Sequence, residues 1–264
     1  MNRHILILSL AIALLAGGCK NKDDRSFNIF TIADDKQLGM QVKAEIASDP
    51  VQFPILSETQ YPQAYTYLRG LRDKILNGGK VFYKNEFVWE LYIIQDDNTL
   101  NAFCAPGGYI YVYTGLIKYL SSEDELAGVL GHEMAHADRR HSTDQLTKQY
   151  GIGTLVSVVL GNNPGKLTEI AEGLLFLGFS RSNETEADEY SVKYLCPTDL
   201  NAAGAAGFFE KIEAQGGSNP PQFLSTHPNP DNRIQHIHEV EVEEGCAGTN
   251  TNDSGYAAFK ASLP

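Results

Sequence analysis

The chain has 264 residues, and its 33 acidic side chains outnumber its 21 Lys and Arg, for a formal net charge of −12 and a pI near 5.0. This length is enough for one sizeable hydrophobic core, or for one domain with a long tail. The acidic balance argues against a nucleic-acid-binding function, which needs clustered cations. It says little about a substrate, because acidic surfaces usually serve solubility.

The N-terminus has the pattern of a targeting segment. After Arg3, residues 5–16 form an apolar run that is too short for a permanent membrane span. The run ends in Gly-Gly-Cys at Cys19, which resembles a bacterial lipobox. We therefore expect a signal peptide over residues 1–18, a lipidated Cys19, and a polar tether over 19–32; an ordinary secretory signal cut nearby is the alternative.

The first half of the remaining chain predicts two helices, then strands. The helices are expected at residues 34–47 and 63–76, where Asn-Gly-Gly stops the second one. Alternation and β-forming residues predict three strands, the last two joined by a Pro-Gly-Gly turn, and a short helix follows; these four elements are expected at 88–95, 101–105, 109–113 and 116–120.

A His-Glu-x-x-His pattern, from His132 to His136, follows directly. Ser122 and Glu125 have capping-box spacing, and apolar residues then recur with helical period, so the segment is predicted to be a helix. Residues four apart share a helix face, so both imidazoles can bind one metal ion. Glu133 then lies beside that metal and can accept a proton from water.

A catalytic zinc needs a third protein ligand. His141 is unsuitable, since the surrounding residues do not follow the known spacing for a third histidine. Glu184 and Asp188 are four apart, so one can bind the metal while the other orients a ligand histidine. The alternative is a solvated acidic helix.

The C-terminal half is predicted to be helical. The apolar run at 152–160 is too short to cross a bilayer and is expected to be a core helix, although contact with a membrane surface is a second possibility. The helix with Glu184 should end before Pro197, and further helices are expected at 200–214 and 231–243. The tail at 245–264 has no strong pattern.

Three cysteines remain after the expected processing. In an oxidising compartment one pair can bridge, and we hypothesise a disulfide between Cys196 and Cys246. This bridge would hold the C-terminal segment against the helix that carries Glu184. The equally weighted alternative is three buried free thiols, including Cys104.

Four motifs occur in one order along residues 34–243. They are Asn101-Ala-Phe-Cys-Ala-Pro-Gly-Gly-Tyr-Ile-Tyr-Val112, the His-Glu-x-x-His helix, Ser-Arg-x-x-Glu-x-x-Ala-Asp ending at Asp188, and Thr226-His-Pro followed by Arg233. Together they resemble the HtpX/BepA/Oma-like zinc metallopeptidases, relatives of the CAAX prenyl protease. The chain looks like a stand-alone catalytic domain over residues 33–244, followed by the tail.

The resemblance implies a fold and a metal centre. The expected fold is α+β and mainly α, a zincin-like (gluzincin) metalloprotease domain whose small three-stranded sheet packs on the metal-binding helix. One Zn²⁺ per chain is implied, with His132, His136 and Glu184 as ligands. Glu133 is implied as general base, and Asp188 as the carboxylate that supports the ligands.

Further site residues follow from the same resemblance. His227 and Arg233 are implied as catalytic residues, and the resemblance leaves open whether His227 is inhibitory or stabilises an oxyanion. Asn101, Ala102 and Phe103 match a strand to which an extended substrate adds. On residue type alone, a turn explains His227 and Asn101 as well.

The resulting functional hypothesis is a zinc-dependent endopeptidase of the bacterial cell envelope. It would be lipid-anchored in the outer membrane, on its periplasmic face or at the cell surface, and would degrade misfolded or unassembled envelope proteins. Its partners are polypeptide substrates and the membrane, not nucleic acid. The alternative is a latent or non-catalytic, chaperone-like binder of unfolded polypeptides.

Overall fold

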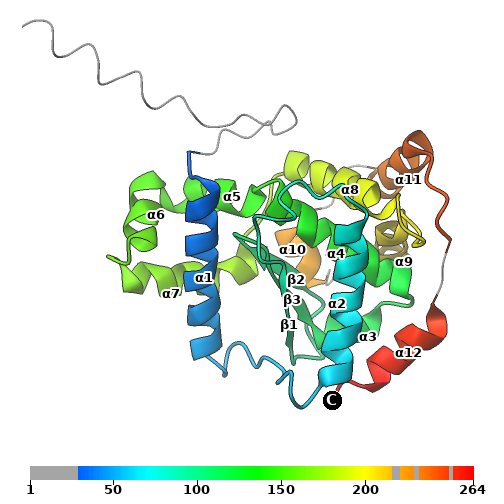
Figure 1. Ribbon diagram of the computed structural model, residues 1–264, viewed down its shortest axis with the longest axis horizontal. Helices are drawn as coiled ribbons and strands as arrows, with labels where there is room; N and C mark the ends of the chain where they lie inside the picture. Colours follow the sequence, from blue (N-terminus) through cyan, green and yellow to red (C-terminus); the bar gives the residue numbers. More distant parts are fainter. Residues whose placement is uncertain (1–28, 216–220, 229–231, 250–251) are drawn as a thin grey trace, which may run out of the picture.

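The computed structural model describes residues 29–215, 221–228, 232–249 and 252–264 (Figure 1). The expected signal peptide, the lipidation site Cys19 and most of the tether lie outside these residues. Within the described ranges, no helix combines the length and the apolar character that a membrane span needs.

The described chain is mainly helical, with one small sheet. The helices are α1 (Ile32–Ser48), α2 (Pro62–Asn77), α3 (Thr114–Tyr119), α4 (Glu123–Asp138), α5 (His141–Tyr150), α6 (Ile152–Val159), α7 (Pro164–Gly173), α8 (Arg181–Leu195), α9 (Gly204–Gln215), α10 (Gln222–Thr226), α11 (Arg233–Glu244) and α12 (Asp253–Ala261), with a short 3₁₀ helix η1 (Leu174–Phe176). The strands are β1 (Glu90–Ile94), β2 (Ala102–Ala105) and β3 (Tyr109–Tyr113). This confirms the predicted α+β, mainly α architecture with three strands.

The sheet separates two hydrophobic clusters. Its strand order is β1-β3-β2, with β1 parallel and β2 antiparallel to β3. Successive residues of a strand face opposite sides. Ile110 and Val112 therefore join the cluster with α2, α4, α8 and α9, whereas Tyr109, Tyr111 and Tyr113 join the cluster with α1 and α7. The sheet consequently lies between α1 and α2 (Figure 1).

Helix α4 is central to the larger cluster and packs against β2, α8 and α9. Ser122 caps it by accepting a hydrogen bond from the Glu125 amide, as predicted, at 3.2 Å. The Glu125 carboxylate accepts from the Ser121 amide, at 2.7 Å, so the reciprocal bond of a capping box goes one residue further back than expected. The cap therefore still defines where the helix begins.

A glycine lets α9 approach α4 closely. A Cβ atom on Gly128 would lie 2.1 Å from the backbone nitrogen of Ala205, far inside van der Waals contact. Ser191 of α8 donates a hydrogen bond to the Gly128 carbonyl at 2.8 Å. Both α9 and α8 therefore pack against α4 at Gly128, and α8 carries expected site residues.

The hypothesised disulfide is confirmed. Cys196 and Cys246 form a bridge that joins the end of α8 to the segment after α11, across a sequence separation of 50 residues. Cys104 is a buried free thiol. The alternative of three free thiols is therefore wrong.

Four α-helices did not emerge from the sequence pattern: α5, α7, α10 and α12. Helix α12 lies in the tail for which no strong pattern was found. Phe259 of α12 stacks on Tyr67 of α2 at a centroid distance of 4.5 Å, and Tyr256 donates to the Ile117 carbonyl at 2.6 Å. Helices of this length are marginal in water and form through tertiary packing, which local periodicity does not report.

Two glycine-to-alanine changes should have opposite effects on stability. Gly128→Ala forces a methyl group into the Ala205 backbone, and we expect it to lower the free energy of unfolding by about 2–3 kcal/mol. Gly70, within α2, has no atom within 4 Å of the position that a methyl group would take, so Gly70→Ala should raise that free energy by about 0.5–1 kcal/mol. Urea unfolding of both variants measures the difference. Equal effects would contradict the close α4–α9 contact.

Candidate active site

Four side chains from three segments converge at the end of α4. His132 and His136 come from α4, Glu184 from α8, and His227 from the residue that ends α10. Each offers one ligand atom, and these four atoms all lie within 4.8 Å of one another. All four side chains are at most 1% exposed. The fold thus gathers the three residues expected as zinc ligands and adds His227 to them.

The separations within this group match a zinc site. The Nε2 atoms of His132 and His136 are 3.0 Å apart, and the His136 Nε2 lies 3.3 Å from the Glu184 Oε1. The His227 Nδ1 lies 3.2 Å from the His132 Nε2 and 3.1 Å from the same Glu184 oxygen. In a tetrahedral zinc site with ligands at about 2.0–2.1 Å, neighbouring donors are separated by about 3.3 Å. The nitrogen and carboxylate donors therefore fit Zn²⁺.

Asp188 and Arg233 stand behind this group. The Asp188 Oδ1 lies 2.8 Å from the His132 Nδ1, which leaves the Nε2 of that ring directed at the ligand group. Arg233 forms an ion pair with Asp188 at 2.6 Å and approaches the Glu184 Oε2 at 3.2 Å. Its guanidinium also lies 3.9 Å from the ring centroid of Phe209. The arginine is thus in contact with two carboxylates of the site.

Glu133 is a buried carboxylate beside the ligand group. It is fully buried, and neither of its oxygens has a hydrogen-bond partner within the described residues. The His227 Nε2 lies 3.4 Å from its Oε1. Burial raises the pKa of Glu133 above its usual value, although His227 and His132 act in the opposite direction. Such a group is poised to take a proton from a molecule that enters the site.

The surrounding charges favour a cation at the ligand group. Burial lowers the pKa of His132, but hydrogen bonds to Asp188 and Glu184 outweigh it and raise that pKa to about 9. Burial raises the pKa of Glu184, but His227, His132 and His136 outweigh it and hold that pKa well below its usual range. An ionised carboxylate among buried nitrogen donors is an arrangement that a divalent cation stabilises.

Two aromatic rings hold the histidines in place, and neither was predicted from the sequence. Phe179 stacks on His136 with ring centroids 3.9 Å apart, and Phe223 stacks on His227 at 4.2 Å. Phe179 directly precedes the Ser180 cap of α8, and Phe223 lies one helical turn before His227. Their positions beside the motifs are the signal that sequence reasoning missed.

The expected substrate strand is buried in this structure. Asn101, Ala102 and Phe103 are each at most 5% exposed. The Asn101 carbonyl accepts a hydrogen bond from the Tyr113 amide at 3.1 Å, whereas both polar atoms of its side chain lack partners within the described residues. Phe103 stacks on Tyr111 at 4.7 Å. The strand lies beside α4, where the motif resemblance expected it.

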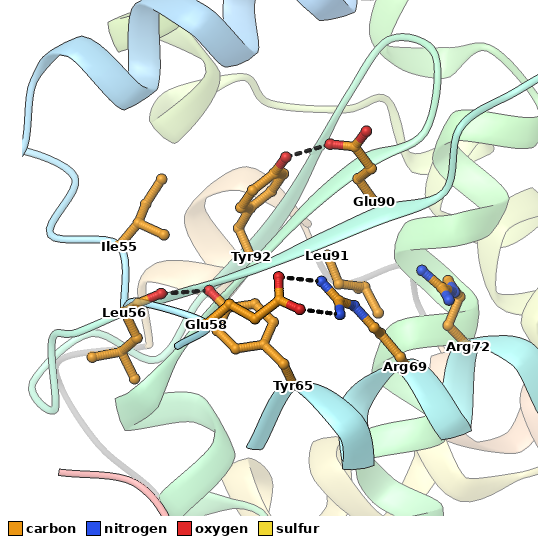
Figure 2. Close-up of a pocket in the computed structure, with 9 residues that line it drawn as sticks. All are labelled: Ile55, Leu56, Glu58, Tyr65, Arg69, Arg72, Glu90, Leu91 and Tyr92. Atoms are coloured by element: carbon orange, nitrogen blue, oxygen red, sulfur yellow. Dashed lines mark hydrogen bonds and ion pairs between the residues drawn. The ribbon is translucent and has the colours of Figure 1, made fainter. Parts of the chain in front are cut away.

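A hollow lies at the β1 edge of the sheet. It has a volume of about 520 Å³ and is lined by residues of α2, of β1 and of the segment before α2 (Figure 2). The ion pair between Glu58 and Arg69 lies across it. No residue of the ligand group lines this hollow, so we place the candidate active site at α4.

Comparison with known proteins points to one peptidase family. A model of that family, peptidase family M48, matches residues 74–241. The chain is 30% identical over 220 residues to the mitochondrial metalloendopeptidase OMA1 of Schizosaccharomyces pombe, covering 81% of this chain and 63% of that protein. It is 28% identical over 264 residues to the metalloprotease LoiP of Escherichia coli, covering 93% and 99%.

A third relative is a longer protein. The chain is 31% identical over 163 residues to the beta-barrel assembly-enhancing protease of Yersinia pestis, covering 55% of this chain and 33% of that protein. The chain thus spans about a third of the Yersinia protein and less than two thirds of the yeast one.

Zinc should stabilise the fold measurably. A ligand that binds only the folded state at 1,000 times its Kd adds about 4.1 kcal/mol to the free energy of unfolding. We therefore expect a chelator to lower the Tm and added zinc to restore it. His136→Ala, which removes one donor, should greatly reduce this difference. A Tm that is the same with and without zinc would contradict the metal site.

Proposed function

The chain belongs to peptidase family M48, and on that basis we propose that it is a zinc-dependent endopeptidase with a gluzincin-type site. The observation that carries this proposal is the position of Glu133. Its buried carboxylate has no hydrogen-bond partner within the described residues, and it adjoins a group of three histidines and Glu184. A carboxylate left unpartnered beside metal ligands suits general-base chemistry better than a structural role.

We propose His132, His136 and Glu184 as the residues that hold one Zn²⁺. When bound, zinc supplies Lewis-acid polarisation of a carbonyl group and of water at neutral pH. Glu133 accepts the proton of the attacking water and passes it to the leaving amine. The burial that raises the pKa of Glu133 makes it a stronger base for that proton.

Asp188 and Arg233 position the site in this proposal. Asp188 holds His132 through its Nδ1, which leaves the opposite nitrogen for the metal. Arg233 is in ion-pair contact with Asp188 and Glu184, and this favours a role in holding these carboxylates. The catalytic role of Arg233 that the motif resemblance implies stays a prediction.

The outer edge of β2 is the proposed substrate site. In the antiparallel pairing of β2 with β3, Asn101 and Phe103 direct their backbone N–H and C=O groups at β3. Those of Ala102, the residue between them, therefore point away from β3. The Cys104 carbonyl, at the same edge, already accepts from the Ser142 hydroxyl at 3.1 Å. For an extended polypeptide to add beside Ala102 through main-chain hydrogen bonds, close to the metal group, the residues that bury Ala102 in this structure must first move away.

The proposed setting is the bacterial cell envelope. One relative is named for enhancing β-barrel assembly, and this supports misfolded or unassembled envelope proteins as substrates. The lipobox-like end of the N-terminal segment supports lipid attachment at Cys19 and an outer-membrane location. We propose residues 33–244 as the catalytic domain.

Replacing Glu133 is the first test of the activity. Glu133→Gln keeps the shape of the side chain but removes its ability to accept a proton, so zinc should remain bound while casein hydrolysis is lost. Glu123→Gln is a matched control, because Glu123 is a buried carboxylate of the same helix that bonds Tyr67 and Asn252 away from the site.

The outcomes separate the alternatives. Hydrolysis by the wild type and the control, but not by Glu133→Gln, supports the endopeptidase. Retained turnover in Glu133→Gln would remove this residue from the mechanism. A wild type that binds zinc and unfolded casein without cleaving it favours the chaperone-like alternative, in a latent or non-catalytic form.

His227 should restrain the enzyme. Its Nδ1 lies among the ligand atoms, where it would fill the fourth position that a catalytic zinc leaves for water. We therefore expect His227→Ala to raise the rate of casein hydrolysis. A fall of about 10²–10³-fold would instead indicate that His227 stabilises the oxyanion.

A further inference from the structure

His141 contacts His136, a proposed zinc ligand, through the ring nitrogen that does not face the ligand group. It is the first residue of α5, and its Nδ1 lies 3.0 Å from the Nδ1 of His136. Its other ring nitrogen, Nε2, lies 3.2 Å from the Glu186 Oε2. The His141 side chain is 1% exposed and that of Glu186 27% exposed. A chain of three side chains therefore leads from His136 towards the surface.

The two facing nitrogens restrict where the protons sit. His136 presents its Nε2 to the ligand group, so its proton must be on Nδ1 when it binds a metal. That N–H then donates to the Nδ1 of His141, which must be unprotonated there and carry its own proton on Nε2. The Nε2–H in turn donates to Glu186. Only this pair of tautomers satisfies every contact.

We propose that His141 is a positioning residue for His136 and that Glu186 fixes the tautomer of His141; this proposal rests on the zinc site of the proposed function. His132 is oriented directly by the Asp188 carboxylate, which lies 2.8 Å from its Nδ1. One histidine ligand is thus oriented by a carboxylate in direct contact, and the other by a carboxylate that acts through the imidazole of His141.

Arg139 fixes the position of the Glu186 carboxylate. Its Oε1 accepts from the Nε of Arg139 at 3.0 Å, while its Oε2 faces His141. The Arg139 guanidinium lies 4.4 Å from the ring centroid of Tyr190. The Glu186 carboxylate thus contacts Arg139 through one oxygen and faces the His141 Nε2 with the other, where it can accept the Nε2 proton.

The turn between α4 and α5 places His141. Helix α4 ends at Asp138, and Arg140 adopts a left-handed conformation with φ of 60°, which is uncommon for a residue other than glycine. Its Nε donates to the buried Asp35 of α1 at 2.6 Å, and Thr143 donates to the same carboxylate at 2.8 Å. Helix α1 thereby holds the turn that brings His141 beneath His136.

The test compares zinc affinity in variants of the full chain. His141→Leu removes the acceptor, and its zinc Kd should rise by about 10–100-fold. His141→Asn places an amide oxygen near the position of Nδ1, so its Kd should stay within about threefold of the wild type. Glu186→Ala keeps both imidazole rings, so it tests the proposal even if His141→Leu fails to fold. Its zinc Kd should rise by several-fold. His238→Leu, at an exposed histidine of α11, is the matched control.

A nuclear magnetic resonance measurement adds a readout that packing alone does not move. In the zinc-loaded, ¹⁵N-histidine-labelled protein, His136 should carry its proton on Nδ1 and His141 on Nε2. A proton on the Nδ1 of His141 would overturn the proposal, and so would unchanged zinc affinity in both His141→Leu and Glu186→Ala. An asparagine variant that binds zinc as weakly as the leucine variant, at the wild-type Tm, would also overturn it.

Failure of this inference is distinguishable from failure of the proposed function. A wild type that binds zinc through His136 but cleaves no peptide contradicts the endopeptidase and leaves the positioning of His136 intact. Variants that retain wild-type zinc affinity while the wild type cleaves casein contradict the positioning role and leave the endopeptidase intact.

Discussion

The packing of α8 against α4 is the contact on which the site depends. Helix α4 supplies His132, Glu133 and His136, but a nitrogen pair on one helix face cannot enclose a metal ion alone. Ser191 bonds the Gly128 carbonyl across this contact, and Glu184 of α8 then stands 3.3 Å from His136. Because packed interiors yield little, the ligand distances follow from how closely these helices approach.

Buried charge is the second constraint on the fold. Carboxylates, histidines and an arginine share a buried region, and each unpaired charge there would cost several kcal/mol. Asp188 and Arg233 form an ion pair, as do Asp35 and Arg140 at the α4–α5 turn. Neither oxygen of Glu133 has a hydrogen-bond partner within the described residues, and a group that costs stability without a partner is expected where chemistry needs it. The charges that support the site are therefore paired, whereas the proposed base has no hydrogen-bond partner in the part of the chain that the structure describes.

Sequence reasoning worked where a local rule operates. The His-Glu-x-x-His spacing placed both imidazoles on one face, Ser122 marked the start of α4, and the glycines of the 106–108 turn joined β2 to β3. It failed where a residue acts on distant neighbours. His141 was discarded as a metal ligand, and its contact with His136 depends on a left-handed Arg140 held by α1. Helix α12 was missed because its packing partners are remote in sequence.

By itself, the sequence determined the type of chemistry. Two histidines and a glutamate at helical spacing predict a metal-binding pair with a base beside it, and the later Glu184 and Asp188 share a helix face for the same geometric reason. Only the tertiary structure decided how these pieces meet. It brought His227 among the ligand atoms, paired Arg233 with Asp188, and buried the β2 edge. Periodicity along the chain describes which side a residue faces, whereas the distance between two helices depends on every side chain packed between them.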